Sequence, residues 1–139
     1  MSGGISDLGV LLRSMQAALN EGCYVYCQVD DLGTVPLEQI IALIREPEGI
    51  TVVLAEADAI RLQLPILFRA AWITLQVHSD LAAVGLTAAF STALGDAGIS
   101  CNVIAGALHD HIFVPIDQGQ RALRVLNELQ SISGRQEKS

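Results

Sequence analysis

The segment WITLQVHSDLAAVGLTAAFSTALGDAGISCNVIAGALHDHIFVPI, residues 72–116, has the clearest structural pattern in the chain. It begins with apolar and polar residues that alternate over Trp72–His78, which is typical of a half-buried strand. Apolar residues at helical spacing follow over Leu86–Ala97, and Gly98 comes where a left-handed helix end favours glycine. The segment ends in two short strands, Ser100–Ala105 and His111–Ile116. It therefore predicts the order strand, helix, strand, strand.

Further elements are predicted on both sides of this segment. Apolar residues from Leu8 to Leu19 fall at helical spacing after Ser6, which is a good helix N-cap. The elements expected next are strands at Cys23–Val29, Gln39–Arg45 and Gly49–Ala55, and a short helix at Glu56–Leu64. A final helix is expected to start at Asp117, which forms a capping-box pattern with Gln120.

The two halves of the chain have a similar plan. The second half reads β-α-β-β-α, and the first reads β-β-β-α after an extra helix, so the first half lacks an internal helix. This duplication predicts an α+β, ferredoxin-like βαββαβ-type fold with tandem halves, antiparallel sheets and helices on one face. We expect a degenerate half with the extra helix at 1–68, a complete half at 69–132, and a disordered tail at 133–139. The halves are expected to share a sheet or strand, because each alone is too small to bury much surface.

The sheet face beneath the helices should carry the core of the second half. Its expected members are Ile73, Leu75, Val77, Ile112 and Val114.

Composition excludes several classes of protein. The chain has eight basic and fifteen acidic residues and a net charge of −7, whereas nucleic-acid binding needs a basic patch. No apolar run approaches the roughly 20 residues of a membrane-spanning helix, and the first residues lack the pattern of an export signal. The three cysteines fit no zinc or redox spacing. We therefore expect a cytoplasmic protein with free thiols that binds neither nucleic acid nor membrane.

The segment resembles an ACT domain, the small-molecule-sensing module of aspartate kinases and other enzymes of amino-acid pathways. The resemblance lies in VGLTAAF (84–90), AGISCNVIAG (97–106) and HDHIFVPI (109–116). The whole chain is similar to short, free-standing bacterial ACT-like proteins, and its second half to the terminal ACT unit of aspartate kinases. This resemblance implies a non-enzymatic regulatory protein that binds an amino acid and needs no cofactor. A homodimer is expected as well, because the unpaired strand edges of a small sheet need cover.

The resemblance also implies a position for the effector, where the first strand of one unit runs into its helix and faces the second strand of a neighbouring unit. Transferred by position, the turn and helix start comprise His78, Ser79, Val84, Gly85, Leu86 and Thr87, and the facing strand comprises Cys101, Asn102 and Val103. Glycine lets a backbone approach a ligand closely, and the N–H groups of a helix start can hold a carboxylate. The Asn102 amide offers both a donor and an acceptor.

A second reading of the same residues needs no ligand. Gly85 is then an ordinary glycine at a helix entry, and Asn102 a surface residue of a strand. The chain would be a structural or protein–protein assembly module, joined through a sheet edge or through the apolar side that carries Trp72 and Phe113.

A more remote alternative is a metal-binding protein or hydrolase. His109 and His111 would point to the same side of an extended segment, with His78 or Asp110 as a third ligand. A polar turn stabilised by local hydrogen bonds also explains this HDH sequence. No catalytic residue is assigned, because a buried cysteine such as Cys101 usually behaves as a small apolar residue.

Overall fold

The computed structural model describes residues 8–76 and 85–137, with side chains as far as Ser133. The helices and strands are α1 (Leu8–Ser14), β1 (Gln16–Leu19), β2 (Tyr24–Val29), β3 (Ile40–Glu46), β4 (Gly49–Ala55), α2 (Glu56–Arg61), β5 (Phe68–Gln76), α3 (Leu86–Asp96), β6 (Asn102–Ala105), β7 (Asp110–Pro115) and α4 (Gly119–Glu137). Two 3₁₀ turns, η1 (Leu37–Gln39) and η2 (Ile116–Gln118), precede β3 and α4. The α+β class predicted from the sequence is confirmed.

The described strands form one antiparallel sheet with β5 in its middle. The order is β3-β4-β2-β5-β7-β6, and β1 also pairs with β5. The first residues of β5, Phe68–Ala70, pair with β2, and its last residues, Ile73–Gln76, pair with β1. Both partners lie along the same edge of β5, because β7 pairs with the other edge from Ala70 to Leu75.

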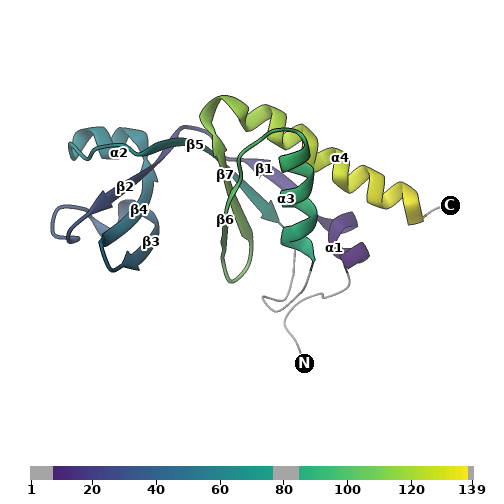
Figure 1. The fold of residues 1–139 in the computed structure, drawn as a ribbon, viewed down its shortest axis with the longest axis horizontal. Coiled ribbons are helices and arrows are strands. Elements are labelled where there is room, and N and C mark those ends of the chain that lie inside the picture. The colour runs from purple at the N-terminus through teal and green to yellow at the C-terminus, as the bar shows by residue number, and fades with distance from the viewer. Residues whose placement is uncertain (1–7, 77–84, 138–139) are drawn as a thin grey trace.

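Strand β5 is therefore shared by two four-stranded units that lie side by side (Figure 1). The first unit has the order β3-β4-β2-β5 and the second has β1-β5-β7-β6. Both are ferredoxin-like arrangements. Strand β1 lies near the start of the chain, yet it completes the second unit. A cut between the two halves of the sequence would consequently divide the second unit.

Helices cover one face of each unit. In the second unit, α1, α3, α4 and the strands bury an apolar core that contains Leu11, Met15, Ala71, Ile73, Leu75, Leu86, Phe90, Leu94, Ile99, Ile112, Val114, Ala122 and Leu126. In the first unit, α2 and the segment before β3 cover a smaller core of Val25, Cys27, Val35, Val52, Leu54 and Ala59. Four of the five expected core residues, Ile73, Leu75, Ile112 and Val114, are confirmed as buried. The fifth, Val77, lies outside the described residues.

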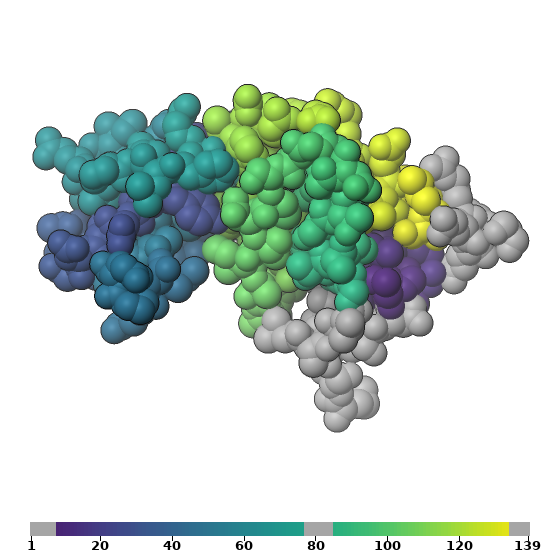
Figure 2. Space-filling model, in the orientation of Figure 1, coloured from purple at the N-terminus to yellow at the C-terminus, as the bar shows by residue number. Residues whose placement is uncertain are grey.

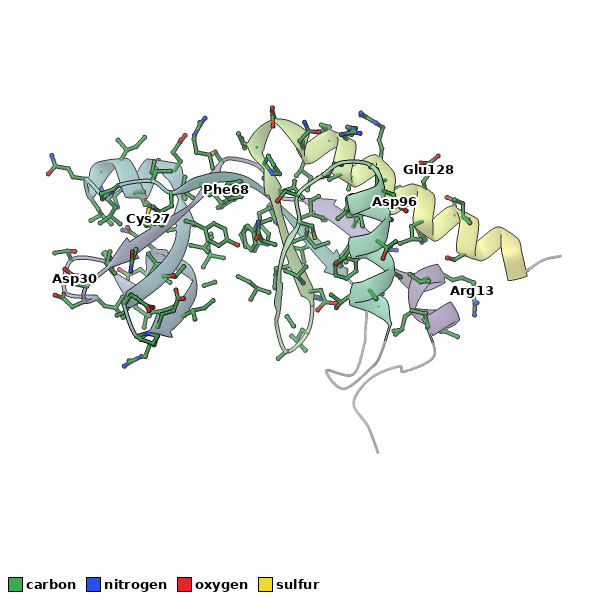
Figure 3. All side chains as sticks on the ribbon, in the orientation of Figure 1. Arg13, Cys27, Asp30, Phe68, Asp96 and Glu128 are labelled. Carbon is green, nitrogen blue, oxygen red and sulfur yellow. The ribbon has the colours of Figure 1, made fainter. Side chains whose placement is uncertain are left out.

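A third apolar cluster lies on the opposite face of the sheet and joins the two units. Its buried members are Val53, Ala70 and Phe113, and its half-buried members include Tyr24, Tyr26, Ile41, Ala42, Phe68, Trp72 and Ile104. Figure 3 shows Phe68 at the junction of the units and Cys27 within the first unit. The two units are thus held together by side-chain packing as well as by the shared strand.

The N-terminal segment differs from the prediction of a single helix up to Leu19. Helix α1 ends at Ser14, whose hydroxyl donates a hydrogen bond to the Val10 carbonyl at 2.9 Å. Residues Gln16–Leu19 are instead strand β1. The apolar spacing does fit a helix, but an unpaired stretch of β5 offers these residues a ladder of backbone hydrogen bonds. Tertiary pairing of this kind overrides local propensity.

The C-terminal end also differs from the prediction. Helix α4 continues to Glu137, whereas the sequence predicts a disordered tail from Ser133. The Gln130 Nε2 donates a hydrogen bond to the Arg13 carbonyl at 2.9 Å, which joins α4 to the end of α1. Leu129 packs against the core of the second unit. Among the described residues, no helix combines the length and the apolar character needed to cross a membrane.

Candidate functional site

The turn into α3 begins at Gly85, the glycine of the predicted effector site. Gly85 is the N-cap of α3, with a φ of 103° in the left-handed region that favours glycine. A Cβ atom at this position would lie 3.2 Å from Cδ2 of Leu8 in α1. Both the backbone conformation and the close contact with α1 therefore explain why glycine stands here.

The first turn of α3 is open to an anion as far as the described residues show. No side chain caps the helix at Gly85, and its first turn has no acidic residue. The first N–H groups of a helix lack intrahelical partners, and the helix dipole gives this end a partial positive charge. Leu86 is buried in the core, while Thr87 is exposed beside these N–H groups. A carboxylate would satisfy both the free donors and the dipole.

The facing strand is less open than the sequence suggests. Cys101 and Val103 pack against the core of the second unit. Burial raises the pKa of the Cys101 thiol, and a hydrogen bond with Ser91 opposes this rise. Asn102 is exposed, and its Nδ2 donates a long hydrogen bond of 3.5 Å to the Phe113 carbonyl. Of these three residues, only Asn102 presents an exposed polar side chain to a ligand.

The two groups of predicted site residues do not meet within one chain. Asn102 lies at the start of β6, where it pairs with Phe113. The other end of β6 lies near the end of β5, because Ala105 pairs with Asp110 and Asp110 pairs with Leu75. Helix α3 follows β5, so Gly85 and Asn102 lie at opposite ends of an 11-residue helix. At 1.5 Å per residue, that helix separates them by about 16 Å. His78, Ser79 and Val84 lie outside the described residues.

The histidines of the HDH sequence have separate environments. His109 is exposed, whereas His111 is half-buried and accepts a hydrogen bond at Nδ1 from Trp72 Nε1 at 3.1 Å. Burial lowers the pKa of His111, His109 lowers it further, and Asp110 opposes the change. Burial raises the pKa of Asp110. Within residues 8–76 and 85–137, no three His, Cys, Asp or Glu residues form a group that could hold a metal ion.

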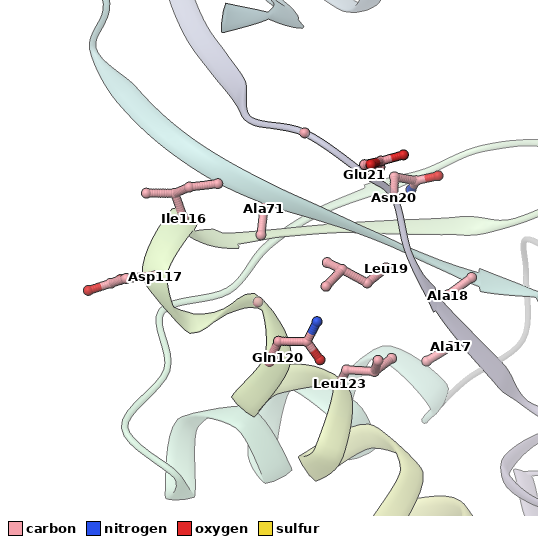
Figure 4. Close-up of a pocket in the computed structure, with 12 residues that line it drawn as sticks. Ala17, Ala18, Leu19, Asn20, Glu21, Ala71, Ile116, Asp117, Gln120 and Leu123 are labelled. Atoms are coloured by element: carbon pink, nitrogen blue, oxygen red, sulfur yellow. The ribbon is translucent and has the colours of Figure 1, made fainter.

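A surface cavity that sequence reasoning missed lies between β1 and the start of α4 (Figure 4). Its volume is about 690 Å³. It is lined by Ala17, Ala18, Leu19, Asn20, Glu21, Gly22, Ala71, Ile116, Asp117, Gly119, Gln120 and Leu123. No local sequence pattern indicates this cavity, because it depends on the pairing of β1 with β5, which places the N-terminal segment beside α4.

The floor of this cavity is closed by tight packing. A Cβ atom at Gly119 would lie 2.9 Å from Cβ of Ala71, so α4 begins almost in contact with β5. The Asn20 side chain is already hydrogen-bonded to β5. Its Nδ2 donates to the Trp72 carbonyl at 3.1 Å and to Thr74 Oγ1 at 2.9 Å. The cavity therefore combines apolar walls with the Gln120 amide and the Glu21 and Asp117 carboxylates.

These features define a class of protein: two ferredoxin-like units in tandem that share a strand, with a helix start at Gly85 that no described side chain caps. Two family models described as ACT domain match the chain, at residues 3–71 and 68–128. A solved protein of unknown function from Vibrio cholerae, described as a possible transport protein, is 48% identical, with a TM-score of 0.79. The match covers 88% of this chain and 95% of that one. The chain therefore belongs to the ACT-domain family, as the sequence resemblance implied.

More distant structures share the fold alone. A protein from Agrobacterium tumefaciens has a TM-score of 0.64 at 14% identity, over 84% of this chain and 89% of its own. The ligand-free regulatory subunit of aspartate kinase from Thermus thermophilus has a TM-score of 0.62 at 12% identity, over 81% and 95%. A search of curated proteins gives no match.

Proposed function

We propose that this protein is a non-enzymatic regulator that binds an amino acid at the start of α3. ACT domains are typically regulatory, ligand-binding domains, and the open helix start is the observation that supports this particular site. The α-carboxylate of the effector would accept hydrogen bonds from the first N–H groups of α3, beside the exposed Thr87. The free cysteines at positions 23, 27 and 101 fit the reducing cytoplasm, where we place the protein.

A second copy of the chain would complete the proposed site. Among the described strands, none pairs with the outer edge of β6. If two copies paired there in antiparallel fashion, Asn102 of one would lie beside Ala105 of the other, at the end of the unit where α3 begins. The amide of Asn102 could then reach an effector held by Gly85 and Thr87 of the other copy. The proposed regulator is thus a homodimer with two equivalent sites.

Binding would regulate through this dimer. An effector that contacts both copies binds the dimer more tightly than the monomer, and only such a difference in affinity can shift the equilibrium between them. The alternative, an assembly module without a ligand, is favoured by the same free edge of β6. The two functions differ in whether an amino acid changes the stability of the protein.

The test is a thermal-shift screen of the protein against the twenty amino acids, with Thr87→Glu and Thr87→Gln as matched variants. An effector at one hundred times its Kd should stabilise the folded protein by about 2.7 kcal/mol. Glu at the first turn suits the helix dipole, so Thr87→Glu should fold normally, yet its charge should repel the effector carboxylate. Thr87→Gln has a similar shape without the charge and should retain most of the shift. A screen in which no amino acid stabilises the protein would leave the assembly module as the better account.

Dimerisation is tested separately by sedimentation velocity. Ala105→Lys places a charge on the edge of β6, which should weaken pairing between copies, while Ala107→Lys in the adjoining exposed hairpin should not. A monomeric wild-type protein at micromolar concentration would contradict the shared site.

A further inference from the structure

A separate cavity lies at the junction of the two units, on the sheet face that the helices leave uncovered. Its volume is about 320 Å³, and its lining residues are Ile41, Ala42, Trp72, Ile104, His111 and Phe113. Figure 2 shows a recess between the blue strands of the first unit and the green β6–β7 hairpin. The volume is at the lower end of the roughly 300–1,000 Å³ of small-molecule pockets. It is much too small for a helix or a strand of a partner protein.

The aromatic wall of this cavity is held in place by neighbouring rings. Trp72 and Phe113 are stacked, with 6.0 Å between ring centroids and 19° between ring planes. Tyr24 contacts Trp72 edge-on at 5.0 Å, and Tyr26 contacts Phe113 edge-on at 5.7 Å. Both tyrosines come from β2 of the first unit, so the two units together fix the rings. A wall fixed in this way needs no rearrangement to receive a flat ligand.

The hydrogen bonds around His111 determine which of its nitrogens carries the proton. An indole N–H can only donate, so Nδ1 of His111, which accepts from Trp72 Nε1, is unprotonated. Thr74 Oγ1 lies 3.5 Å from the same nitrogen and itself accepts from Asn20. The lowered pKa of His111 favours the neutral ring, in which the proton must then lie on Nε2. His111 is therefore held as a neutral N–H donor.

Nε2 of His111 remains available to a ligand. Among the described residues it has no hydrogen-bond partner. It is also partly accessible, because no fully buried side-chain nitrogen or oxygen of the described residues lacks a partner. A Cβ atom at position 106 would lie only 3.2 Å from it, so the glycine there leaves this nitrogen uncovered. The lining thus combines stacked aromatic rings, aliphatic side chains and one neutral donor.

We propose that the junction cavity is a second binding site, for a small uncharged aromatic molecule that carries one hydrogen-bond acceptor. An aromatic ring fits the wall of Trp72 and Phe113, where offset stacking is favourable. The acceptor would bind the His111 Nε2–H. A charged group is disfavoured, because the lining holds no opposite charge to offset its desolvation. A ligand here contacts β3 of the first unit and β5–β7 of the second, so it bridges the two units.

Trp72 makes the test direct, because it is the single tryptophan of the chain. Its indole N–H gives one resonance in a ¹H–¹⁵N spectrum, and that proton is bonded to His111 in the cavity wall. The probe is acetophenone, a ring with one neutral carbonyl acceptor, and the matched control is benzoate, which has the same ring and a charged acceptor. Acetophenone should shift the indole resonance saturably, and benzoate should bind at least tenfold more weakly.

Two further measurements locate the probe. In the wild-type protein, nuclear Overhauser contacts should join the acetophenone methyl group to the methyl groups of Ile41 and Ile104. Ala42→Leu fills the cavity from β3 and should weaken the probe at least tenfold, whereas Ala57→Leu on the exposed surface of α2 should leave binding unchanged. The Overhauser contacts need no substitution, so the test remains decisive if Ala42→Leu does not fold.

Three results would overturn the proposal. The first is the absence of a saturable shift, and the second is benzoate binding as tightly as acetophenone, which would indicate an anion site. The third is a nuclear Overhauser contact between the Trp72 indole proton and a differently labelled second copy in the absence of any probe, which would show that a second copy covers the cavity.

Discussion

The two units have the same strand order but differ in how their sheets are covered. In the second unit, α3 connects β5 to β6, and α1 and α4 pack beside it over a large core. In the first unit, β2 leads to β3 through a loop that contains only the 3₁₀ turn η1. Val35 from this loop is 4% exposed and packs into the core of the first unit. A unit of this fold can therefore lack one helix if a loop side chain still closes its core.

The two units also differ in how well they suit an anionic ligand. A helix that follows the first strand of a unit presents its N-terminus near the end of that strand, and α3 does so at Gly85. The loop of the first unit has instead an Asp31 carboxylate that accepts a hydrogen bond from the Gly33 N–H at 2.7 Å. A carboxylate at this position repels an anionic ligand. The proposed effector site therefore belongs to the second unit.

The largest loss of stability is expected from a substitution in the shared strand β5. Ala70 is fully buried and pairs with β2 and β7, so Ala70→Pro affects both units. We expect a loss of at least about 3 kcal/mol in the free energy of unfolding, from a lost ladder hydrogen bond and overpacking. Urea unfolding measured by Trp72 fluorescence and by far-UV circular dichroism should remain coincident.

A matched control for this variant is Ala57→Pro, in the first turn of α2, where proline is tolerated. It should cost much less. If the wild-type protein itself showed two separate transitions, the units would be independent and the shared strand would not couple them.

Leu11→Ala should cause the next largest loss of stability, and it tests whether α1 belongs to the second unit. Leu11 is fully buried against that unit's core, so we expect a loss of about 3 kcal/mol. Hydrogen exchange should show reduced protection in β7 and α4 before β3 and β4. Leu37→Ala is the control, because Leu37 is 75% exposed and its truncation should change stability little. Loss of protection mainly in β3 and β4 would place α1 with the first unit instead.

Asp110→Asn should have the smallest effect, and its sign depends on pH. Burial raises the pKa of Asp110 above 3.8, so the unfolded carboxyl loses its proton first as pH rises. The free energy of unfolding of the wild-type protein therefore decreases as the pH rises from 3.8 through the raised pKa. Asn has no proton to lose, so the variant should melt at a higher temperature than wild type at pH 7, and the advantage should shrink below pH 3.8.

The exposed Asp117 provides the matched variant for this measurement. Asp117→Asn should leave the melting temperature at pH 7 close to that of wild type. A decrease in melting temperature for Asp110→Asn at pH 7 would show that the ionised carboxylate stabilises the fold.

Local pattern predicted most elements of the second unit, because Ile73, Leu75, Ile112 and Val114 alternate regularly along their strands. The same kind of pattern gave the wrong element at Met15–Leu19, where helical spacing continues into β1. The partner of β1 is more than fifty residues away in β5, and no local signal reports that pairing. Long-range pairing also determined the cavity beside α4, which explains why the sequence did not predict it.

The candidate site was predictable in part, for a related reason. Gly85 is recognisable from its position between a strand and an apolar helical stripe, although its left-handed conformation was not predicted. The placement of Asn102 relative to Gly85 depends on the direction in which α3 returns along the sheet. That direction follows from the strand order, which no local sequence pattern indicates.

The pairing of β1 with β5 also has a consequence for the order in which the chain can fold during synthesis. The strands of the first unit follow one another from β2 to the start of β5, so this unit can form while the ribosome is still extending the chain. Helix α1 and β1 are made earlier but must wait for later partners, since the Arg13 carbonyl and Gln130 Nε2 are 117 residues apart in sequence. Helix α1 and β1 are thus translated before their partners in the second unit, yet they are among the last elements to reach their final positions.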